Sequence, residues 1–276
     1  MKKQKPICGL ITDFGNKDYF IGVMKGLIKK INPDAEVIDI SNDIPSYSLL
    51  PASFTIEQAY RFFPAGAIFL VVVDPGVGTE RNILLVEYDD RFFIAPDNGV
   101  LTPILQEKEK TVFVLDNKNY FLIDGVSTFE ARDKMAPAAA FLSRGVDPQA
   151  MGSLLLGSEF VLNPDYFPSQ LGNSIKARIV YIDKFGNIMT NVSEDFLFDA
   201  LEASGFSKFK TVLNNREIKH FHKTYGHADA GPFMLIGSHQ NLEIAINQNS
   251  AAAVLDAKIG REVVIEFSGK KGNLKE

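Results

Sequence analysis

The stretch AIFLVVVDPGVGTER at residues 67–81 decides the fold of the first half of this chain. Its opening part, residues 67–73, is entirely apolar, as in a strand that is covered on both faces of a sheet. A glycine-rich turn then carries Asp74 and returns Arg81. Ligands of an open α/β sheet bind outside the carboxyl ends of its strands. The stretch therefore predicts a buried strand with Asp74 at a ligand-binding edge, and a tight turn closed by an Asp74–Arg81 ion pair is the alternative.

The segments around this strand alternate between apolar runs and amphipathic stretches. The expected strands are 7–11, 37–40, 83–88 and 91–95, and the expected helices are 20–31, 51–62 and 133–142. Asp89-Asp90 lies between two of these strands and predicts a hairpin. Asp133 has the residue type and position of a helix N-cap. The alternation predicts an α/β N-terminal domain over residues 1–165.

The pattern changes near Asn163, where prolines and glycines predict a linker. Beyond it come short strand candidates with few helical stretches between them. They are 175–182, 188–192, 210–213, 233–236, 242–246 and 263–267. This spacing predicts a small antiparallel β-barrel, or a sandwich, as a C-terminal domain over residues 173–276.

Composition narrows the functional classes. The 276 residues carry a net charge of −5, so no basic surface for a nucleic-acid backbone is expected. The lone Cys8 excludes an intrachain disulfide, and the four histidines lack metal-ligand spacing, so no metal site is expected. No run approaches the roughly 20 apolar residues that span a bilayer, and the N-terminus lacks a cleavable signal. We expect a cytoplasmic protein that does not bind membranes.

Two motifs place polar groups at the ends of predicted strands. Asp13, after the first strand, is suited to accept both hydroxyls of a ribose, although it is equally suited to a turn or cap. In the second half, Asp183 could hold an ammonium group, Phe185 could stack on a purine, and Asn187 could pair with the purine edge. A plain hairpin turn is the alternative for residues 183–187.

Five motifs in this order resemble the S-adenosyl-L-methionine (SAM) hydroxide adenosyltransferases, a family related to the fluorinase and chlorinase. They are ITDFG at 11–15, DPGVGTER at 74–81, FEARD at 129–133, IDKFGN at 182–187 and LEIAIN at 242–247. The resemblance implies an N-terminal α/β domain, a C-terminal β-barrel and a homotrimer whose active sites lie between one subunit's N-terminal domain and a neighbour's C-terminal domain. It also implies hydrolysis of SAM to adenosine and methionine by activated water attacking C5′, with SAM as substrate and no cofactor.

The resemblance also assigns binding roles to individual residues. Asp13 would hold the ribose diol, while Asp18 and Asp183 would face the methionine end. The adenine would contact Phe185 and Asn187. The pocket would be completed by Ser238 and the backbone near Ala245.

The family's water-activating triad is Asp–Arg–His, and this chain departs from it at one position. Asp74 and Arg81 match the first two members, but Glu130 stands where the family has histidine. Glu130 serves as the base if burial or a neighbouring carboxylate raises its pKa. Alternatively it pairs with Arg81 and quenches the site, which would leave a protein that binds SAM or adenosine with little turnover. Halide transfer is a third possibility.

Overall fold

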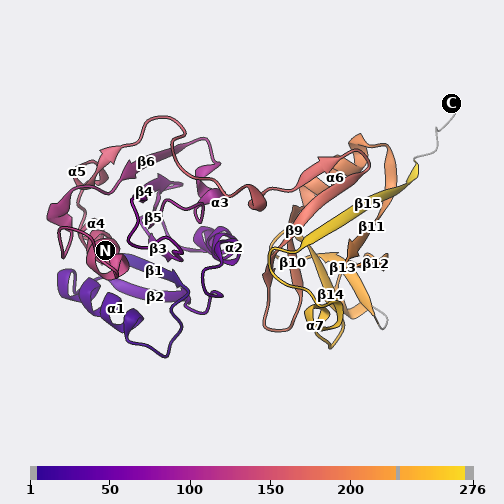
Figure 1. Cartoon of the computed structure of the whole chain (residues 1–276), viewed down its shortest axis with the longest axis horizontal. Coiled ribbons are helices and arrows are strands. Elements are labelled where there is room, and N and C mark those ends of the chain that lie inside the picture. The colour runs from indigo at the N-terminus through magenta and orange to yellow at the C-terminus, as the bar shows by residue number, and fades with distance from the viewer. Residues whose placement is uncertain (1–4, 228–230, 271–276) are drawn as a thin grey trace. The chain divides into compact units, whose positions relative to one another are not determined.

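A computed structural model of the chain describes residues 5–227 and 231–270. The chain divides into two compact units, Met1–Asn163 and Pro164–Glu276 (Figure 1). Within the described ranges, none of the helices combines the length and apolarity needed to cross a membrane.

The N-terminal unit is built on a seven-stranded mixed sheet in the order β2-β1-β3-β5-β4-β6-β7. Its strands are β1 (Ile7–Thr12), β2 (Glu36–Ser41), β3 (Ile68–Val72), β4 (Ile83–Tyr88), β5 (Arg91–Pro96), β6 (Lys110–Val114) and β7 (Ser153–Leu154). The strands β2, β1, β3 and β5 are parallel neighbours, whereas β4, β6 and β7 pair antiparallel. The predicted hairpin at Asp89-Asp90 is confirmed, and β6 and β7 extend the sheet beyond it.

The register of the two central strands places the site. β1 and β3 run parallel with Thr12 opposite Val72, so both strands end at the same edge of the sheet. Asp13 directly follows Thr12, and Asp74 lies two residues beyond Val72. The sheet therefore brings together two carboxylates that are far apart in the sequence. They lie at the carboxyl ends of parallel strands, where ligands of open α/β sheets bind.

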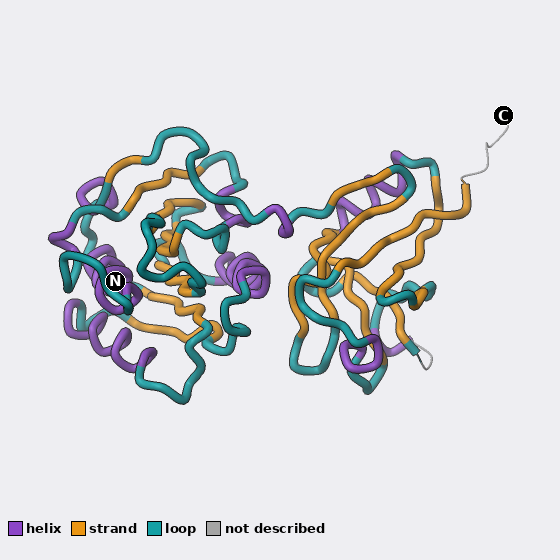
Figure 2. The backbone as a smooth tube through the Cα atoms, viewed as in Figure 1, coloured by secondary structure: helices purple, strands orange, loops and turns teal. Residues whose placement is uncertain are grey.

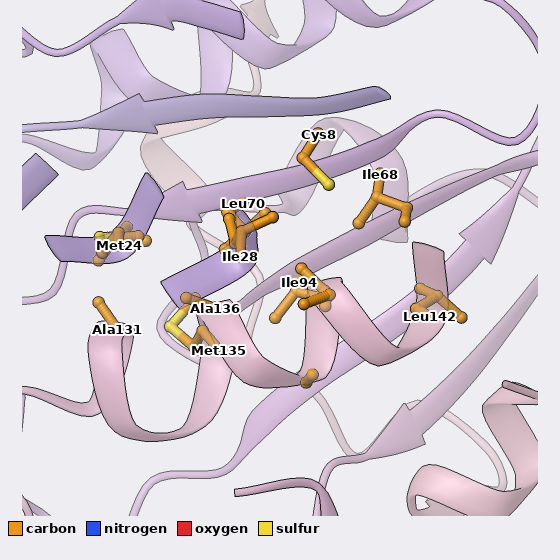
Figure 3. Packing of buried hydrophobic residues seen from close by; sticks show 14 of the residues in the cluster. Cys8, Met24, Ile28, Ile68, Leu70, Ile94, Ala131, Met135, Ala136 and Leu142 are labelled. Carbon is orange, nitrogen blue, oxygen red and sulfur yellow. The ribbon is translucent and has the colours of Figure 1, made fainter. Parts of the chain in front are cut away.

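Helices cover both faces of this sheet (Figure 2). They are α1 (Phe20–Ile31), α2 (Leu49–Ala59), α3 (Thr102–Leu105), α4 (Ala136–Ser143) and α5 (Pro148–Met151). Alternate residues of β3 enter two different cores: Leu70 packs with Met24 and Ile28, as Figure 3 shows, and Phe69 packs with Ile56. The prediction that this strand is buried on both faces is confirmed, because each face is covered by helices.

The helix expected at 133–142 begins differently. A π-helical turn, Ala131–Met135, precedes α4, and Glu130 occupies the N-cap position. The prediction of Asp133 as the N-cap is wrong. Its side chain is fully buried and accepts hydrogen bonds from Ser127 Oγ at 2.5 Å and Arg132 Nε at 2.6 Å. Asp133 pairs with these side chains rather than with the free backbone N–H groups of a helix end.

The C-terminal unit is an antiparallel, nearly closed, barrel-like sheet in the order β12-β11-β15-β9-β10-β14-β13, with β8 paired to β9. Its strands are β8 (Ser169–Leu171), β9 (Ser174–Ile182), β10 (Ile188–Ser193), β11 (Phe206–Leu213), β12 (Arg216–Ile218), β13 (Pro232–Ile236), β14 (Asn241–Ile246) and β15 (Glu262–Lys270). The two ends of the sheet meet where Met234 of β13 exchanges backbone hydrogen bonds with His220 and His222, which follow β12. These bonds close most of the barrel.

Two helices accompany the barrel, α6 (Glu194–Ala203) and α7 (Ala251–Leu255). Helix α6 is not among the elements expected from the sequence. Its signals are present, because Ser193 Oγ accepts the Phe196 N–H as an N-cap and two acidic residues occupy the first turn. Leu197 and Leu201 then recur at helical spacing and are buried in the barrel core. The N-cap serine and the acidic first turn are therefore the sequence signals that indicate this short helix between two strands.

Candidate active site

A cavity of about 620 Å³ opens at the carboxyl ends of β1 and β3. Among the residues that the structure describes, four acidic side chains line it, against the single basic side chain of Arg132. The acidic residues are Asp13, Asp18, Asp74 and Glu130. Aromatic rings of Phe14, Phe20 and Phe129 pack edge-to-face or tilted beside them, with centroids 5.2–5.8 Å apart. We call this the first cavity; its walls combine negative charge with apolar surface, which suits an organic cation.

Asp13 is half-buried in this cavity and held from one side. Its Oδ2 accepts a hydrogen bond from the Tyr47 backbone N–H at 2.8 Å. Burial raises the pKa of Asp13 above its ordinary value, the Asp74 carboxylate adds to the rise, and the Tyr47 N–H works against it. A hydroxyl donor from a ligand would stabilise the charged form.

Asp74, Arg81 and Glu130 form one buried ion-pair chain. Arg81 Nε donates to both oxygens of Asp74 at 2.9 and 2.8 Å, and Arg81 Nη2 donates to Asp74 Oδ2 and, at 2.5 Å, to Glu130 Oε2. The three side chains are 7–10% exposed. Asp74 and Glu130 line the first cavity, whereas Arg81 is not among its lining residues. Within the described ranges, Arg81 Nη1 is buried with no hydrogen-bond partner.

Glu130 also contacts a residue that the sequence analysis missed. Lys134 Nζ donates to Glu130 Oε1 at 2.5 Å, four residues further along the π-helical turn. Burial acts to raise the pKa of Glu130, but the hydrogen bonds and charges of Lys134 and Arg81 outweigh it and lower that pKa. Of the two outcomes expected from the sequence, pairing is the one found, and a raised pKa at Glu130 is not.

The predicted binding residues of the C-terminal unit gather around a separate cavity of about 740 Å³. Asp183, Phe185 and Asn187 line it together with Tyr225 and residues 246–250. We call this the barrel cavity. The Asp183 carboxylate accepts hydrogen bonds from the backbone N–H groups of Phe185 and Asn187 at 2.9 and 2.8 Å, and from Asn187 Nδ2 at 3.0 Å. The segment is thus a hairpin turn between β9 and β10, and it carries Phe185, which is 71% exposed.

Two predicted residues lie outside the lining of this cavity. Ser238 is exposed in the turn between β13 and β14. The Ala245 side chain is fully buried against Phe233 and Leu235, although the adjoining Ile246 lines the barrel cavity. The structure therefore brings together Asp183, Phe185 and Asn187 with the backbone segment that follows Ala245, whereas Ser238 is not among the lining residues.

Two domain models match this chain. The SAM hydroxide adenosyltransferase N-terminal domain matches residues 8–152, and the corresponding C-terminal domain matches residues 177–264. The chain belongs to the SAM hydroxide adenosyltransferase family. The resemblance predicted from the motifs is confirmed.

Relatives span nearly the whole chain. Proteins named (R)-S-adenosyl-L-methionine hydrolase from Methanocaldococcus jannaschii and Thermus thermophilus are each 28% identical, covering 95% and 92% of this chain and 96% of each relative. A protein named fluorinase from Actinopolyspora mzabensis is 26% identical over 96% of this chain and 98% of its own length. The crystal structure of an uncharacterized conserved protein from Thermotoga maritima has a TM-score of 0.83 and 33% identity, covering 94% of this chain and 99% of that one.

Sequence reasoning missed a second group, in the barrel of this family member. Glu243 is 1% exposed and accepts hydrogen bonds from Tyr225 Oη at 2.6 Å and from His239 Nε2 at 3.1 Å. His239 Nδ1 accepts the Asn241 N–H, which places the ring proton on Nε2. Burial, followed by the Glu243 carboxylate, raises the pKa of Tyr225. The network fixes Tyr225 in the wall of the barrel cavity. No local sequence motif predicts this network, because its members come from separate elements.

Proposed function

We propose that this protein hydrolyses SAM to adenosine and L-methionine, with water attacking C5′ in line with the departing sulfur. The observation that carries the proposal is the acidic first cavity with the Asp74–Arg81–Glu130 chain in its wall. Family membership and the relatives named as hydrolases support the same reaction.

The charge of the first cavity suits this substrate. SAM carries a sulfonium and an ammonium group, and four carboxylates face the cavity against one arginine. Opposite charges attract strongly in such a partly enclosed site. The same field repels halide ions, so water is favoured over halide as the nucleophile although a relative is named fluorinase.

Methionine is a good leaving group in this reaction. As the water oxygen bonds to C5′, the C5′–S bond breaks and its electron pair returns to sulfur, giving the neutral thioether of methionine. Departure needs no acid, and the work lies in aligning and deprotonating water. We assign proton acceptance to Glu130 and charge compensation to Arg81, whose buried Nη1 has a donor to spare in the described structure. A carboxylate with a lowered pKa is a weak base, so we expect slow hydrolysis.

The paired state of Glu130 favours a second candidate, a protein that binds SAM or adenosine with little turnover. Incubation of the pure protein with each sulfonium epimer of SAM, followed by chromatography, separates the two. Adenosine and methionine in equal amounts support hydrolysis. Tight binding without product supports the second candidate.

Asp13→Ala is expected to weaken adenosine binding by about 1.5–3 kcal/mol, the value of a hydrogen bond to a charged group. The reason is its position in the first cavity, held by Tyr47 with the carboxylate half-buried. Isothermal titration calorimetry measures the effect, with the exposed Asp34→Ala as a matched control. Equal affinity of Asp13→Ala and the parent, with the fold intact, would remove the ribose-diol role.

We also propose a homotrimer in which the first cavity of one subunit and the barrel cavity of a neighbour act on one substrate. The support is that the predicted binding residues divide between two cavities, one in each unit. We expect light scattering to give three times the 30.5 kDa chain mass. We also expect co-expressed Asp13→Ala and Asn187→Ala chains to regain activity that neither has alone, whereas a fully active monomer would contradict the shared site.

A further inference from the structure

Glu130 is held from two sides by two cations. Arg81 Nη2 donates to one carboxylate oxygen and Lys134 Nζ to the other, each at 2.5 Å. Arg81 is also committed to Asp74, whereas Lys134, 19% exposed, approaches from the side of the π-helical turn. The carboxyl group of Glu130 thus lies between the ion-pair chain of the first cavity and a cation outside it.

Lys134 belongs to a second cavity of about 370 Å³. Glu130 lines both this cavity and the first one. The turn that carries Arg81 is divided in the same way, since Val77 lines the first cavity and Gly78 and Thr79 line the second. The turn and Glu130 therefore lie between the two cavities.

We propose that the second cavity is the exit for the proton of the hydrolysis, and that Lys134 is the positioning residue that holds Glu130 for this transfer. This rests on the proposed function. Attack of water on C5′ releases one proton for each sulfonium consumed, while the substrate occupies the first cavity. Glu130 takes that proton from the attacking water, and its carboxyl group releases it to solvent through the second cavity. The electron pair of the broken C5′–S bond stays on sulfur, so no other reactant is needed.

The charges around Glu130 give Lys134 a specific effect. Glu130 contacts Arg81 and shares the lining of the first cavity with the charged residues Asp13, Asp18, Asp74 and Arg132. It shares the lining of the second cavity with Asp116, Lys118, Asp124 and Lys134. Lys118 is paired with Asp124 at 2.8 Å, and Arg132 with Asp133. Lys134 is thus the cation of the second cavity that contacts Glu130, and its removal is expected to raise the Glu130 pKa.

The first test is the pH profile of single-turnover adenosine release. Hydrolysis requires Glu130 as a carboxylate, so activity falls as the pH drops through its pKa. In Lys134→Met this acid limb is expected to move up by about one to three pH units, the usual effect of a contacting charge. Lys118→Met, which loses the same charge from the same cavity without touching Glu130, is expected to keep the parent profile. An unmoved limb in Lys134→Met overturns the role of Lys134.

The second test is rescue of Lys134→Ala by ethylamine at saturating SAM. A saturable rise in rate on the acid limb supports entry of ethylamine through the second cavity while SAM occupies the first. Rescue that SAM suppresses by competition overturns the exit role of the second cavity. If the parent releases no adenosine, the exit role falls together with the proposed function. Whether Lys134 holds Glu130 is then tested separately, by measuring the pKa of the Glu130 carboxyl group with ¹³C NMR in the parent and in Lys134→Met. The Glu130→Gln variant assigns the signal. An equal pKa in both overturns it.

Discussion

Glu130→Gln is expected to slow single-turnover adenosine release by about 10²–10⁴-fold, the usual contribution of a positioned base. The amide keeps the size of the side chain, but its single oxygen accepts from only one of the two sides on which Arg81 and Lys134 donate, and it takes no proton. Glu130→His is expected to retain or raise the rate, because imidazole titrates near neutrality and two adjacent cations favour its neutral, basic form.

Rapid-quench measurement of adenosine in the parent and both variants checks this, with SAM affinity measured separately. Release by Glu130→Gln at the parent rate would show that Glu130 is not the base. An inactive parent with intact binding and an active Glu130→His would favour the binding-protein candidate.

Arg81→Met is expected to abolish hydrolysis and to destabilise the N-terminal unit by about 3–5 kcal/mol at neutral pH, the cost of leaving buried charges unpaired. Both Asp74 and Glu130 lose their shared cation, and each side chain is 10% exposed or less. Arg81→Lys is expected to recover only part of the stability. The lysine restores the positive charge, but its ammonium group cannot reproduce the forked contact with Asp74. The exposed Arg144→Met is the matched control.

The stability loss has a defined pH dependence. The pKa of Glu130 is lowered in the folded protein, so its pairing stabilises the fold above its unfolded pKa, and this contribution disappears as the pH falls through the folded value. The difference between Arg81→Met and the parent is therefore largest at neutral pH and shrinks in acid. Native-state hydrogen exchange of the β3 amides reports the local unfolding free energy of this unit at each pH. A difference independent of pH would contradict a role based on charge.

The sequence by itself determined the elements that local patterning controls. The unbroken apolar run before Asp74 predicted a strand buried on both faces, and helices do cover both faces of β3. Because strand ends can be read from such runs, Asp13 and Asp74 were also placed correctly at one edge of the sheet. The five motifs, taken in order, were specific enough to predict the family.

Tertiary structure decided what depends on partners distant in the chain. Arg81 and Glu130 are 49 positions apart, so the sequence left open whether the Glu130 pKa rises or falls. Burial raises it, two cations lower it, and the balance follows only from the folded distances. The π-helical turn that brings Lys134 to Glu130 and the burial of Asp133 against Ser127 and Arg132 depend in the same way on packing. Periodicity records which face of an element is buried, but not which charged group meets it there.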